Sequence, residues 1–537
     1  MLPGPISAPP STSRLSRRKL LGAAASLPLL LPAAETARAG AAQSSLSSLP
    51  PEFQQVMAKP LYQFAQWQIF VADLHTGEPV YDFHGRDLVV PGSVTKLFPG
   101  AATLEAYGPS YRFQTPVYRT GPVGAEGLLQ GDLILVASGD LTMGGRDTPD
   151  GHIDYVSFDH TYANTTDLAT LTPEDPLAGL NDLASQVAAT GIRHVSGNVV
   201  ADVRLWTLMK KDEYVLSPIM INDNVIDLTI TPGSVGQTAG IAWRPQTQAY
   251  QVQSQVQTVA AGQPPQAAAV STQPGQIVVQ GQIPVDHASV LRTFQIEDPA
   301  NFARTLFIEA LQRQGVTVDA SPIGNNPVDL LPPSGSYVDS QRVALHTSLP
   351  FSENLNLIFK VSQNEQADTL VFLLALKNGH NTFDDGMQDI LPFLKTTPLD
   401  TDSVSLGDGR GNDRADLFSP YTATALLRYM AGQPDGAVYL DALPVLGEKG
   451  SEIDTVSADS PVRGKASAKS GTTAVGDLLH GRIMILGRGL AGYMTARSGR
   501  VLAFSIYVQN VPAAQFEDVF IPIKDQGTMA AAIFERN

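Results

Sequence analysis

A serine and a lysine three residues apart, Ser93 and Lys96, are the residues of this chain best suited to covalent chemistry. They stand in VPGSVTKLFPG, at the start of an apolar helical stretch, where residues i and i+3 share one face and the lysine can reach the hydroxyl. The first turn of a helix also offers N–H groups and a positive dipole to a developing oxyanion. The pair therefore fits a serine nucleophile with a lysine base, although an ordinary helix cap at Ser93 explains the same spacing.

A lysine can serve as a base near neutral pH only if burial or a neighbouring cation lowers its pKa from about 10.4. A second cation stands in KASAKSGTT, where Lys469 is followed by Ser470, Gly471 and Thr472. The small residues of this strand-like stretch would let a substrate backbone lie close. Taken alone, the stretch is equally well explained as an exposed strand end.

Two candidates for a Ser-x-Asn motif lie ten residues apart, beginning at Ser352 and at Ser362. Ser352 opens a short apolar helix, so we interpret it as a helix cap. Ser362 lies in the break between two helices, where side chains can project into a cleft, and Glu365 completes a capping-box pattern with it. We therefore predict that Ser362 and Asn364 belong to the site, with a purely structural capping box at Ser362 as the alternative.

The bulk composition narrows the possible functions. A chain of 537 residues with 43% apolar and 16% charged residues indicates a globular protein of two or three domains. A formal charge of -16 argues against a nucleic-acid partner. The absence of cysteine excludes disulfides and thiolate nucleophiles. The histidines are scattered without a metal-binding motif, so we predict no metal and no cofactor, and interpret His75, His84 and His480 as loop and surface residues.

The start of the chain has the pattern of an export signal. Arg17 and Arg18 precede an apolar run that is shorter than the ~20 residues of a membrane-spanning helix, and a small-x-small site ends at Ala39. We predict a signal peptide of the twin-arginine type over residues 1–39, a linker over 40–51, and export to the periplasm or the cell exterior. No later segment is long and apolar enough to span a membrane, so we expect no integral membrane segment after removal of the signal.

Several secondary-structure elements follow from hydrophobic periodicity and turn residues. The region 112–335 consists mostly of short alternating runs and is predicted to be β-rich, including its Gln-rich part. The other expected elements are a hairpin over 67–90, helices over 93–108, 174–190 and 297–315, two helices broken near Ser362, a helix in SPYTATALLRYMAG, a hairpin turning at TARSGR, and a last helix over 524–536.

The order Ser-x-x-Lys, Ser-x-Asn, Lys-Ser-Gly is the signature order of penicillin-binding proteins and class A β-lactamases. The chain resembles the class C low-molecular-mass penicillin-binding proteins of the penicillin-binding protein 4 type, the D-alanyl-D-alanine carboxypeptidase/endopeptidases of peptidase family S13. The long separation of Ser93 and Ser362 is similar to this family, which carries inserted domains there. Further similar stretches are ASGDLTMGG, SPIMINDN, KVSQNEQADTLV, GDGRGNDRADLFSP and LAGYMTARSGRVLAFSIYV.

The resemblance implies an α/β (α+β) fold, namely a penicillin-binding/β-lactamase-like transpeptidase core with an antiparallel sheet flanked by helices and interrupted by inserted β-rich domains. We expect the catalytic domain to comprise residues 52–111 plus 336–537 and the accessory domain or domains to comprise 112–335. The GDGRGNDR stretch, with Asp408 and Arg414, is expected to be structure beside the cleft.

The resemblance also implies a serine-type carboxypeptidase or endopeptidase that cleaves peptidoglycan stem peptides ending in D-Ala-D-Ala through an acyl-enzyme and is inhibited by β-lactam antibiotics. Ser93 would attack, Lys96 would take its proton, and Ser362 would pass a proton to the leaving amine. Backbone N–H groups of Ser93 and Thr472 would form the oxyanion hole. The substrate's peptide group would be held by Asn364, and its terminal carboxylate by Lys469, Ser470 and Thr472, which flank Gly471.

This sequence departs from the family pattern at four places. Ser470 replaces the usual threonine but keeps a hydroxyl, Gln363 replaces an aspartate, and Gly92 replaces a small residue such as alanine. The segment after Lys469 is longer than usual, which leaves the shape of the cleft beside this strand open.

Two alternatives from other classes remain. A β-lactamase or serine esterase on the same scaffold would share the serine and both lysines. A catalytically silent peptidoglycan-binding protein would rely on the inserted domains. The oligomeric state is also open, a homodimer being one possibility.

Overall fold

The computed structural model describes residues 45–537, so the predicted signal peptide over 1–39 lies outside the described residues. The mixed α/β architecture, with sheets flanked by helices, confirms the predicted fold class. Within residues 45–537, no helix combines the length and apolarity needed to cross a membrane.

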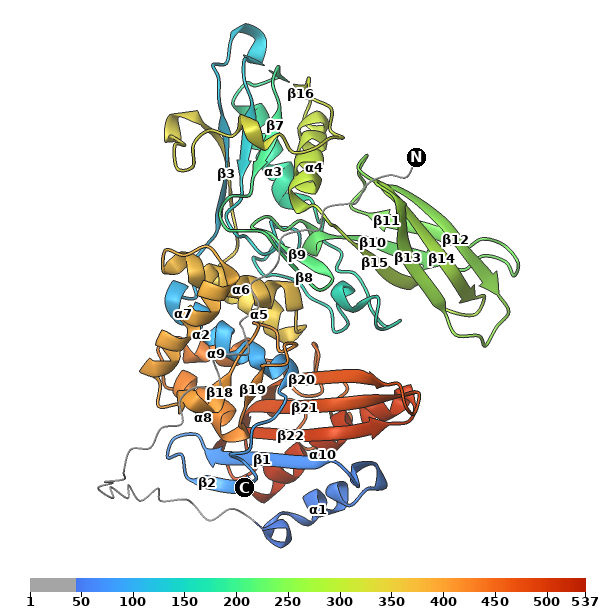
Figure 1. Cartoon of the computed structure of the whole chain (residues 1–537), viewed down its shortest axis with the longest axis vertical. Coiled ribbons are helices and arrows are strands. Elements are labelled where there is room, and N and C mark those ends of the chain that lie inside the picture. The colour runs from blue at the N-terminus through green and yellow to red at the C-terminus, as the bar shows by residue number, and fades with distance from the viewer. Residues whose placement is uncertain (1–44) are drawn as a thin grey trace, which may run out of the picture. The chain divides into compact units, whose positions relative to one another are not determined.

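A five-stranded antiparallel sheet joins the beginning and the end of the described chain (Figure 1). The predicted N-terminal hairpin pairs with the C-terminal strands through β1 and β22, and the hairpin turn at TARSGR connects β21 to β22. In spatial order the strands are β2 (Pro79–Phe83), β1 (Gln66–Asp73), β22 (Val501–Ala513), β21 (Arg482–Thr495) and β20 (Ala466–Asp477).

Helices cover both faces of this sheet because its side chains alternate between two apolar cores. Tyr493 packs into one core and Met494, the next residue, into the other. On the Tyr493 side, α8 (Pro420–Ala431) packs against the central strands, and on the Met494 side α10 (Phe520–Arg536) packs against β21 and against α1 (Pro51–Met57). The last helix thus begins earlier than the predicted residue 524.

The remaining helices next to the sheet form the Tyr493-side core. Nearly every residue of α6 is buried as far as Ala375, so this helix lies at the centre of the core. The predicted break between two helices is present and contains Ser362. The helices are α2 (Leu97–Tyr107), α5 (Phe351–Lys360), α6 (Asn364–Lys377), α7 (Phe383–Thr396) and α9 (Gly436–Asp441), and a short two-stranded sheet of β18 (Val404–Ser405) and β19 (Leu417–Phe418) lies among them.

The region between α2 and α5 is β-rich, as predicted, with two helices near the expected positions. These are α3 (Ala178–Ala189) and α4 (Pro299–Arg313). One sheet has the order β17 (Arg342–Thr347), β3 (Gln114–Arg119), β5 (Leu133–Val136), β7 (Val199–Asp202), and another has β16 (Thr317–Val318), β6 (His194–Val195), β4 (Leu128–Leu129). β17 follows the predicted domain boundary at 335, yet it pairs with β3 on the other side of the region.

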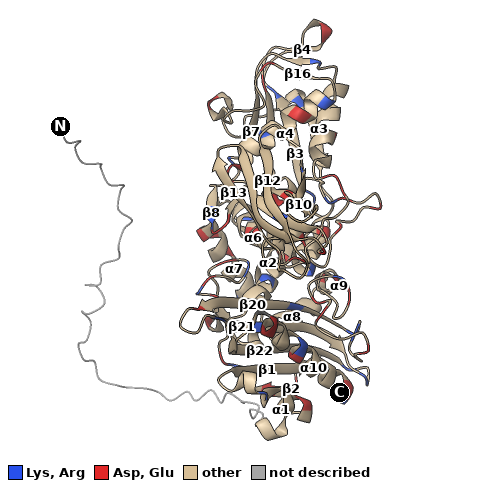
Figure 2. Cartoon of the chain, turned by 90° about the vertical axis from the view of Figure 1, so that its right-hand side faces the viewer, with Lys and Arg blue, Asp and Glu red and all other residues tan. Residues whose placement is uncertain are grey.

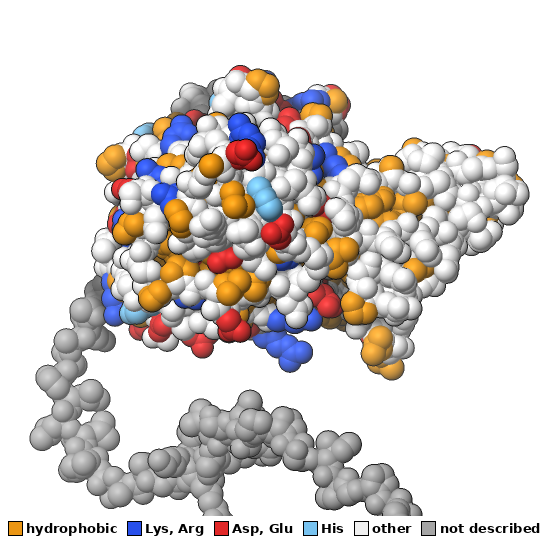
Figure 3. Space-filling model, turned by 90° about the horizontal axis from the view of Figure 1, so that it is seen from above, with side chains coloured by type: hydrophobic (Ala, Val, Ile, Leu, Met, Phe, Trp, Pro, Cys, Tyr) orange, Lys and Arg blue, Asp and Glu red, His pale blue; other side chains and the backbone are white. Residues whose placement is uncertain are grey.

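Three further small sheets complete this region. They are β11 (Gly240–Arg244), β10 (Val225–Thr231) and β15 (Val290–Gln295); β12 (Gln251–Val259), β14 (Gln276–Pro284) and β13 (Gln266–Gln273); and the hairpin of β8 (Met209–Lys211) and β9 (Tyr214–Leu216). The sequence 245–285 contains no charged residue, and Figure 3 shows the corresponding surface at the right almost free of charged side chains. Elsewhere acidic and basic residues are interspersed (Figure 2).

Two predicted helix caps are corrected by the structure. Ser352 is not a cap, because Pro350 occupies the N-cap of α5. Ser362 and Glu365 do not form a capping box, because Ser362 has a left-handed backbone (φ 64°) that places it before the helix. The cap of α6 is Gln363, whose side chain accepts a hydrogen bond from the N–H of Gln366 at 2.7 Å. Glu365 instead lies buried and accepts from an asparagine of the β-rich region.

Candidate active site

Ser93 and Lys96 lie in a single 3-10 turn, Gly92–Lys96, that leads into α2. Because a 3-10 helix has three residues per turn, residues i and i+3 eclipse one another, which brings the two side chains together more directly than an α-helix would. Lys96 Nζ donates to Ser93 Oγ at 2.7 Å. No side-chain cap is formed at the start of the turn, so the capping alternative for Ser93 finds no support in the geometry.

The ammonium group of Lys96 is completely buried. Besides Ser93 it contacts only uncharged oxygens, Oδ1 of Asn364 at 2.8 Å and the carbonyl of Arg410 at 3.1 Å. Burial, and then the nearby charge of Lys469, hold the pKa of Lys96 well below its ordinary value, against the opposing effect of two aspartates, Asp368 and Asp408. A neutral amine at hydrogen-bond distance from a serine hydroxyl can accept its proton.

Strand β20 lies against the Ser93 turn at a distance that only glycine allows. A Cβ added at Gly92 (φ 54°) would lie 2.6 Å from the N atom of Thr472, and one at Gly471 would lie 2.4 Å from the N atom of Ser93. The two backbone N–H groups therefore belong to segments in direct contact. This explains why Gly92 stands where a larger small residue is usual, since its left-handed backbone and the close strand both disfavour a side chain.

The Ser-x-Asn segment is held from the β-rich region. The hydroxyl of Tyr162 donates to the carbonyl of Ser362 at 2.5 Å. Gln363 and Gln366 donate through Nε2 to Oδ1 of Asp223 at 3.2 and 2.8 Å. This contact explains why a glutamine stands at position 363. A carboxylate there would face the carboxylate of Asp223.

Asp223 is the centre of a buried ionic cluster. Its other oxygen accepts from Arg146 at 2.7 Å and from His160 at 2.9 Å, and His160 also contacts Asp227 at 2.7 Å. Burial alone would lower the pKa of His160, but Asp227 and Asp159 raise it to about 10. Asp223 is the middle one of three consecutive residues with left-handed backbone, φ 54°, 48° and 50°. Such a run costs about 1 kcal/mol or more per residue and persists only where the surroundings require it.

The Lys-Ser-Gly motif has a different environment from the one predicted. Lys469 is fully buried and donates to the carbonyl of Ser470 at 2.7 Å. The hydroxyl of Ser470 donates to the buried carboxylate of Glu452. Thr472 Oγ1 accepts from Nη1 of Arg488 at 3.0 Å. Burial and, secondarily, the Arg488 charge lower the pKa of Lys469 to about 7, although Glu452 opposes this shift.

A cleft of about 280 Å³ lies over the serine. Of the predicted site residues it exposes Ser93, Ser362, Ser470, Gly471 and Thr472, while the predicted residues Lys96, Asn364 and Lys469 lie behind its wall. Its other lining residues are Ser157, Phe158, Tyr162, Thr165, Thr166, Val361, Ser451 and Arg488.

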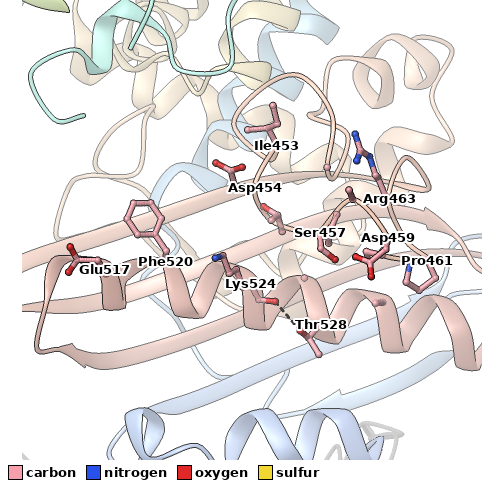
Figure 4. Close-up of a pocket in the computed structure, with 17 residues that line it drawn as sticks. Ile453, Asp454, Ser457, Asp459, Pro461, Arg463, Glu517, Phe520, Lys524 and Thr528 are labelled. Carbon is pink, nitrogen blue, oxygen red and sulfur yellow. Dashed lines mark hydrogen bonds between the residues drawn. The ribbon is translucent and has the colours of Figure 1, made fainter. Parts of the chain in front are cut away.

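A larger cavity of about 1040 Å³ lies between α10 and the loop over 453–463, with Lys524 and Thr528 on the helix (Figure 4). It contains no residue of the three motifs, so it does not compete with the cleft as the candidate site. Within residues 45–537, no group of His, Asp and Glu side chains is placed to hold a metal ion.

Sequence reasoning missed Glu452, Arg488, Tyr162 and Asp223. Glu452 and Arg488 belong to none of the three motifs, and each is brought to Lys469 by sheet and loop packing. Arg488 does lie in the long segment after Lys469 that departs from the family pattern. Asp223 lies in SPIMINDN, a stretch already marked as similar to the family. That stretch, together with ASGDLTMGG, whose Leu141 carbonyl accepts a hydrogen bond from Gln366, indicated that the β-rich region reaches the site.

Comparisons with known proteins identify the family of this chain. The family model "D-Ala-D-Ala carboxypeptidase 3 (S13) family" matches residues 51–526. A D-alanyl-D-alanine carboxypeptidase from Actinomadura sp. is 28% identical over 511 residues, covering 89% of this chain and 84% of the relative. A penicillin-sensitive carboxypeptidase A from Dictyostelium discoideum is 24% identical over 86% of both chains.

The fold is similar to solved structures as well. The crystal structure of penicillin binding protein 4 from Haemophilus influenzae gives a TM-score of 0.66 at 18% identity, covering 90% of this chain and 99% of that one. The same protein complexed with a β-lactam gives a TM-score of 0.64.

Proposed function

The chain belongs to the D-Ala-D-Ala carboxypeptidase S13 family, and we propose that Ser93 is the nucleophile through which it acts as a serine peptidase. The observation that supports this assignment is the contact between Ser93 Oγ and the buried amine of Lys96 at the floor of a cleft. The class of substrate, peptidoglycan stem peptides ending in D-Ala-D-Ala, follows from the family. Endopeptidase action on cross-linked peptides is a further proposal.

We assign the acylation step to Ser93 and Lys96. Lys96, neutral because of its lowered pKa, takes the hydroxyl proton as Ser93 Oγ attacks the carbonyl carbon of the penultimate D-alanine. Asn364 Oδ1 and the Arg410 carbonyl hold the amine in place before and after it becomes an ammonium. Charge formed on Lys96 in this step is stabilised by these two acceptors, which requires no movement of the side chain.

Stabilisation of the tetrahedral intermediate is assigned to the backbone N–H groups of Ser93 and Thr472. The glycines beside them let the two segments approach closely enough for both groups to serve one oxygen. Ser362 exposes its side chain to the same cleft and would relay the proton taken by Lys96 to the amine of the last D-alanine, which leaves as its C–N bond to the acyl carbon breaks. Water then hydrolyses the acyl-enzyme.

We also propose that the start of the chain is a cleaved export signal. Arg17, Arg18 and the apolar run after them support export of the folded protein by a twin-arginine signal, with cleavage after Ala39. We further propose that the β-rich region 112–335 is an accessory part that supports the Ser362 segment. A homodimer is to be tested by light scattering of the mature protein.

The test is intact-mass analysis of the mature protein after incubation with benzylpenicillin. We expect a mass gain of one opened β-lactam on the peptide that contains Ser93, with no gain in Ser93→Ala and normal labelling in the matched variant Ser352→Ala. Rapid turnover of the antibiotic without a lasting adduct would indicate the β-lactamase alternative. No adduct and no turnover in the folded protein would contradict the assignment of Ser93.

A further inference from the structure

We propose that Arg488 on β21 binds the terminal carboxylate of the acyl donor, and so makes a free carboxylate a requirement for fast acylation of Ser93. The inference rests on the proposed function and names the group that selects its substrate. The resemblance to the family implied this role for Lys469, Ser470 and Thr472, and the inference replaces the first two of these residues by Arg488.

The first argument is the charge of the cleft. Among the described residues that line it, Arg488 is the one that carries a charge, and no carboxylate faces the cavity. The other lining side chains are hydroxyls, two aromatic rings and Val361, with the small Gly471 on the strand. A lone cation among hydroxyls is an environment for an anionic group.

The second argument is that the residues expected to bind the carboxylate are engaged elsewhere. Lys469 donates to the carbonyl of Ser470 behind the wall of the cleft, and the Ser470 hydroxyl donates to Glu452. A substrate carboxylate would have to displace a buried carboxylate to use the Ser470 proton. Burial lowers the pKa of Lys469 to about 7, so this lysine is only partly charged at neutral pH. Burial lowers the pKa of Arg488 as well, but from a much higher ordinary value, and a guanidinium stays protonated.

The third argument is the geometry of the guanidinium. Arg488 stands opposite Thr472 in the register of β20 and β21, and its Nη1 donates to Thr472 Oγ1 at 3.0 Å. Because the threonine oxygen accepts this bond, its own proton is free to be donated to a ligand. Guanidinium and hydroxyl thus present donors side by side, next to the N–H of Thr472 that is assigned to the oxyanion.

The orientation of Arg488 is fixed before any substrate binds. Its Nε donates to Oε1 of Gln526 at 3.1 Å, and Gln526 Nε2 donates in turn to the carbonyls of Arg488 and Ile506 at 3.1 and 2.9 Å. Glu452 Oε2 lies 3.7 Å from Nη2, beyond a normal hydrogen bond. The guanidinium is therefore held in place with donors left over for a carboxylate, which lowers the entropic cost of binding one.

The experiment compares two acyl donors that differ only in this carboxylate, N-acyl-D-Ala-D-Ala and N-acyl-D-Ala-D-alaninamide, by their kcat/KM for release of the last residue. The variants are Arg488→Gln and Arg488→Lys. The matched control is Arg482→Gln, which removes a cation from the same strand at a site where it pairs with Asp477, outside the cleft.

We expect Arg488→Gln to lower kcat/KM about 100-fold for the acid and less than about 3-fold for the amide, as for a site that loses one partner of a buried charged pair. Arg488→Lys should fall between this variant and the wild type, and Arg482→Gln should leave the acid/amide ratio unchanged. An acid/amide ratio that is the same in both Arg488 variants and in the wild type overturns the inference. If the glutamine variant does not fold, the ratio in Arg488→Lys decides.

The two proposals fail in different ways. If neither donor nor benzylpenicillin acylates wild-type Ser93, the proposed function is wrong. If all of them acylate it and the acid/amide ratio does not respond to Arg488, the function stands and only the inference fails.

Discussion

Two walls of the cleft are built differently. The strand wall, which carries Thr472, is formed by β20 at the edge of the five-stranded sheet. The Ser362 wall is formed by the break between α5 and α6, where Ser362 has a left-handed backbone. The strand wall is positioned by hydrogen bonds along β21 and by glycine contacts with the Ser93 turn. The Ser362 wall is positioned by Tyr162 and Asp223, both from the β-rich region. One wall therefore follows from the register of a sheet, and the other depends on an ionic cluster contributed from far along the chain.

The buried cations beside the two walls have pKa values shifted in opposite directions. Lys469 is a buried cation with a lowered pKa, because burial and Arg488 outweigh Glu452. His160 is a buried cation with a raised pKa, because its aspartates outweigh burial. The positive charge of Lys469 therefore destabilises the folded state beside the strand wall. The positive charge of His160 stabilises the ionic cluster that supports the Ser362 wall.

The largest effect is expected for a methyl group on the strand wall. In Gly471→Ala the new Cβ would lie 2.3 Å from the carbonyl of Pro91 and 2.4 Å from the N atom of Ser93, so the strand and the nucleophile must separate. We expect the rate of benzylpenicillin acylation to fall by about 1,000-fold, since a displacement near 1 Å can cost 100-fold and both oxyanion donors move. Stopped-flow or quenched mass measurements give the rate.

Gly476→Ala is the matched control for this change. It lies on the same strand, and its Cβ would meet only a leucine side-chain atom at 3.8 Å. An acylation rate close to that of the wild type is expected. Equal losses in the two alanine variants would show that the loss comes from replacing a glycine of β20 and not from the close contact at Gly471, and the argument from close contact would fail.

The second effect tests the Ser362 wall. Asp223→Asn keeps the shape of the side chain but leaves Arg146 and His160 without their shared carboxylate. We expect stability to fall by about 3 kcal/mol, as for a broken buried ion pair, and acylation to slow by about 100-fold in the protein that remains folded. Asp319→Asn, which affects an exposed pair with His194, should change neither. An acylation rate unaffected by Asp223→Asn would mean that Gln363 and Gln366 do not depend on this contact.

The different construction of the two walls explains what the sequence could and could not predict. Some features depend only on the spacing of residues that are close in the sequence, and these could be predicted. They are the helix break at Ser362, the terminal hairpins and the contact of Ser93 with Lys96. The cap by Gln363 and the engagement of Ser470 by Glu452 depend on which distant carboxylate or N–H lies within reach. Such partners are set by tertiary packing, which no short motif records.

The third prediction concerns the pH dependence of stability, in which the two walls should act in opposite directions. Lys469, with a pKa of about 7 in the folded protein against about 10.4 unfolded, makes the folded state more stable as pH rises from 7 to 10. His160, raised from 6.5 to about 10, contributes stability that is complete below pH 6.5 and is lost as pH rises through 10.

Two variants separate these contributions in urea unfolding between pH 7.5 and 9.5. We expect Lys469→Met to lower the slope of the unfolding free energy against pH by about 1.4 kcal/mol per pH unit relative to the wild type. This value corresponds to a difference of about one bound proton between the unfolded and folded states. His160→Gln should raise the slope by the same amount. Shifts of the same sign in both variants would contradict the contrast between the two walls.

The smallest effect is expected at the hydroxyl of Tyr162, which joins the ionic cluster to the cleft because His160 and Tyr162 share one 3-10 turn. Tyr162→Phe removes the donor to the Ser362 carbonyl and should slow acylation about 5-fold, the equivalent of one hydrogen bond of about 1 kcal/mol. Tyr337→Phe, which removes a hydroxyl that donates to Asp202 at 2.6 Å, is the control and should weaken stability without slowing acylation. If Tyr162→Phe behaves like this control, the left-handed backbone of Ser362 is maintained by Gln363 and Asp223 alone, and the β-rich region positions the serine through one contact rather than two.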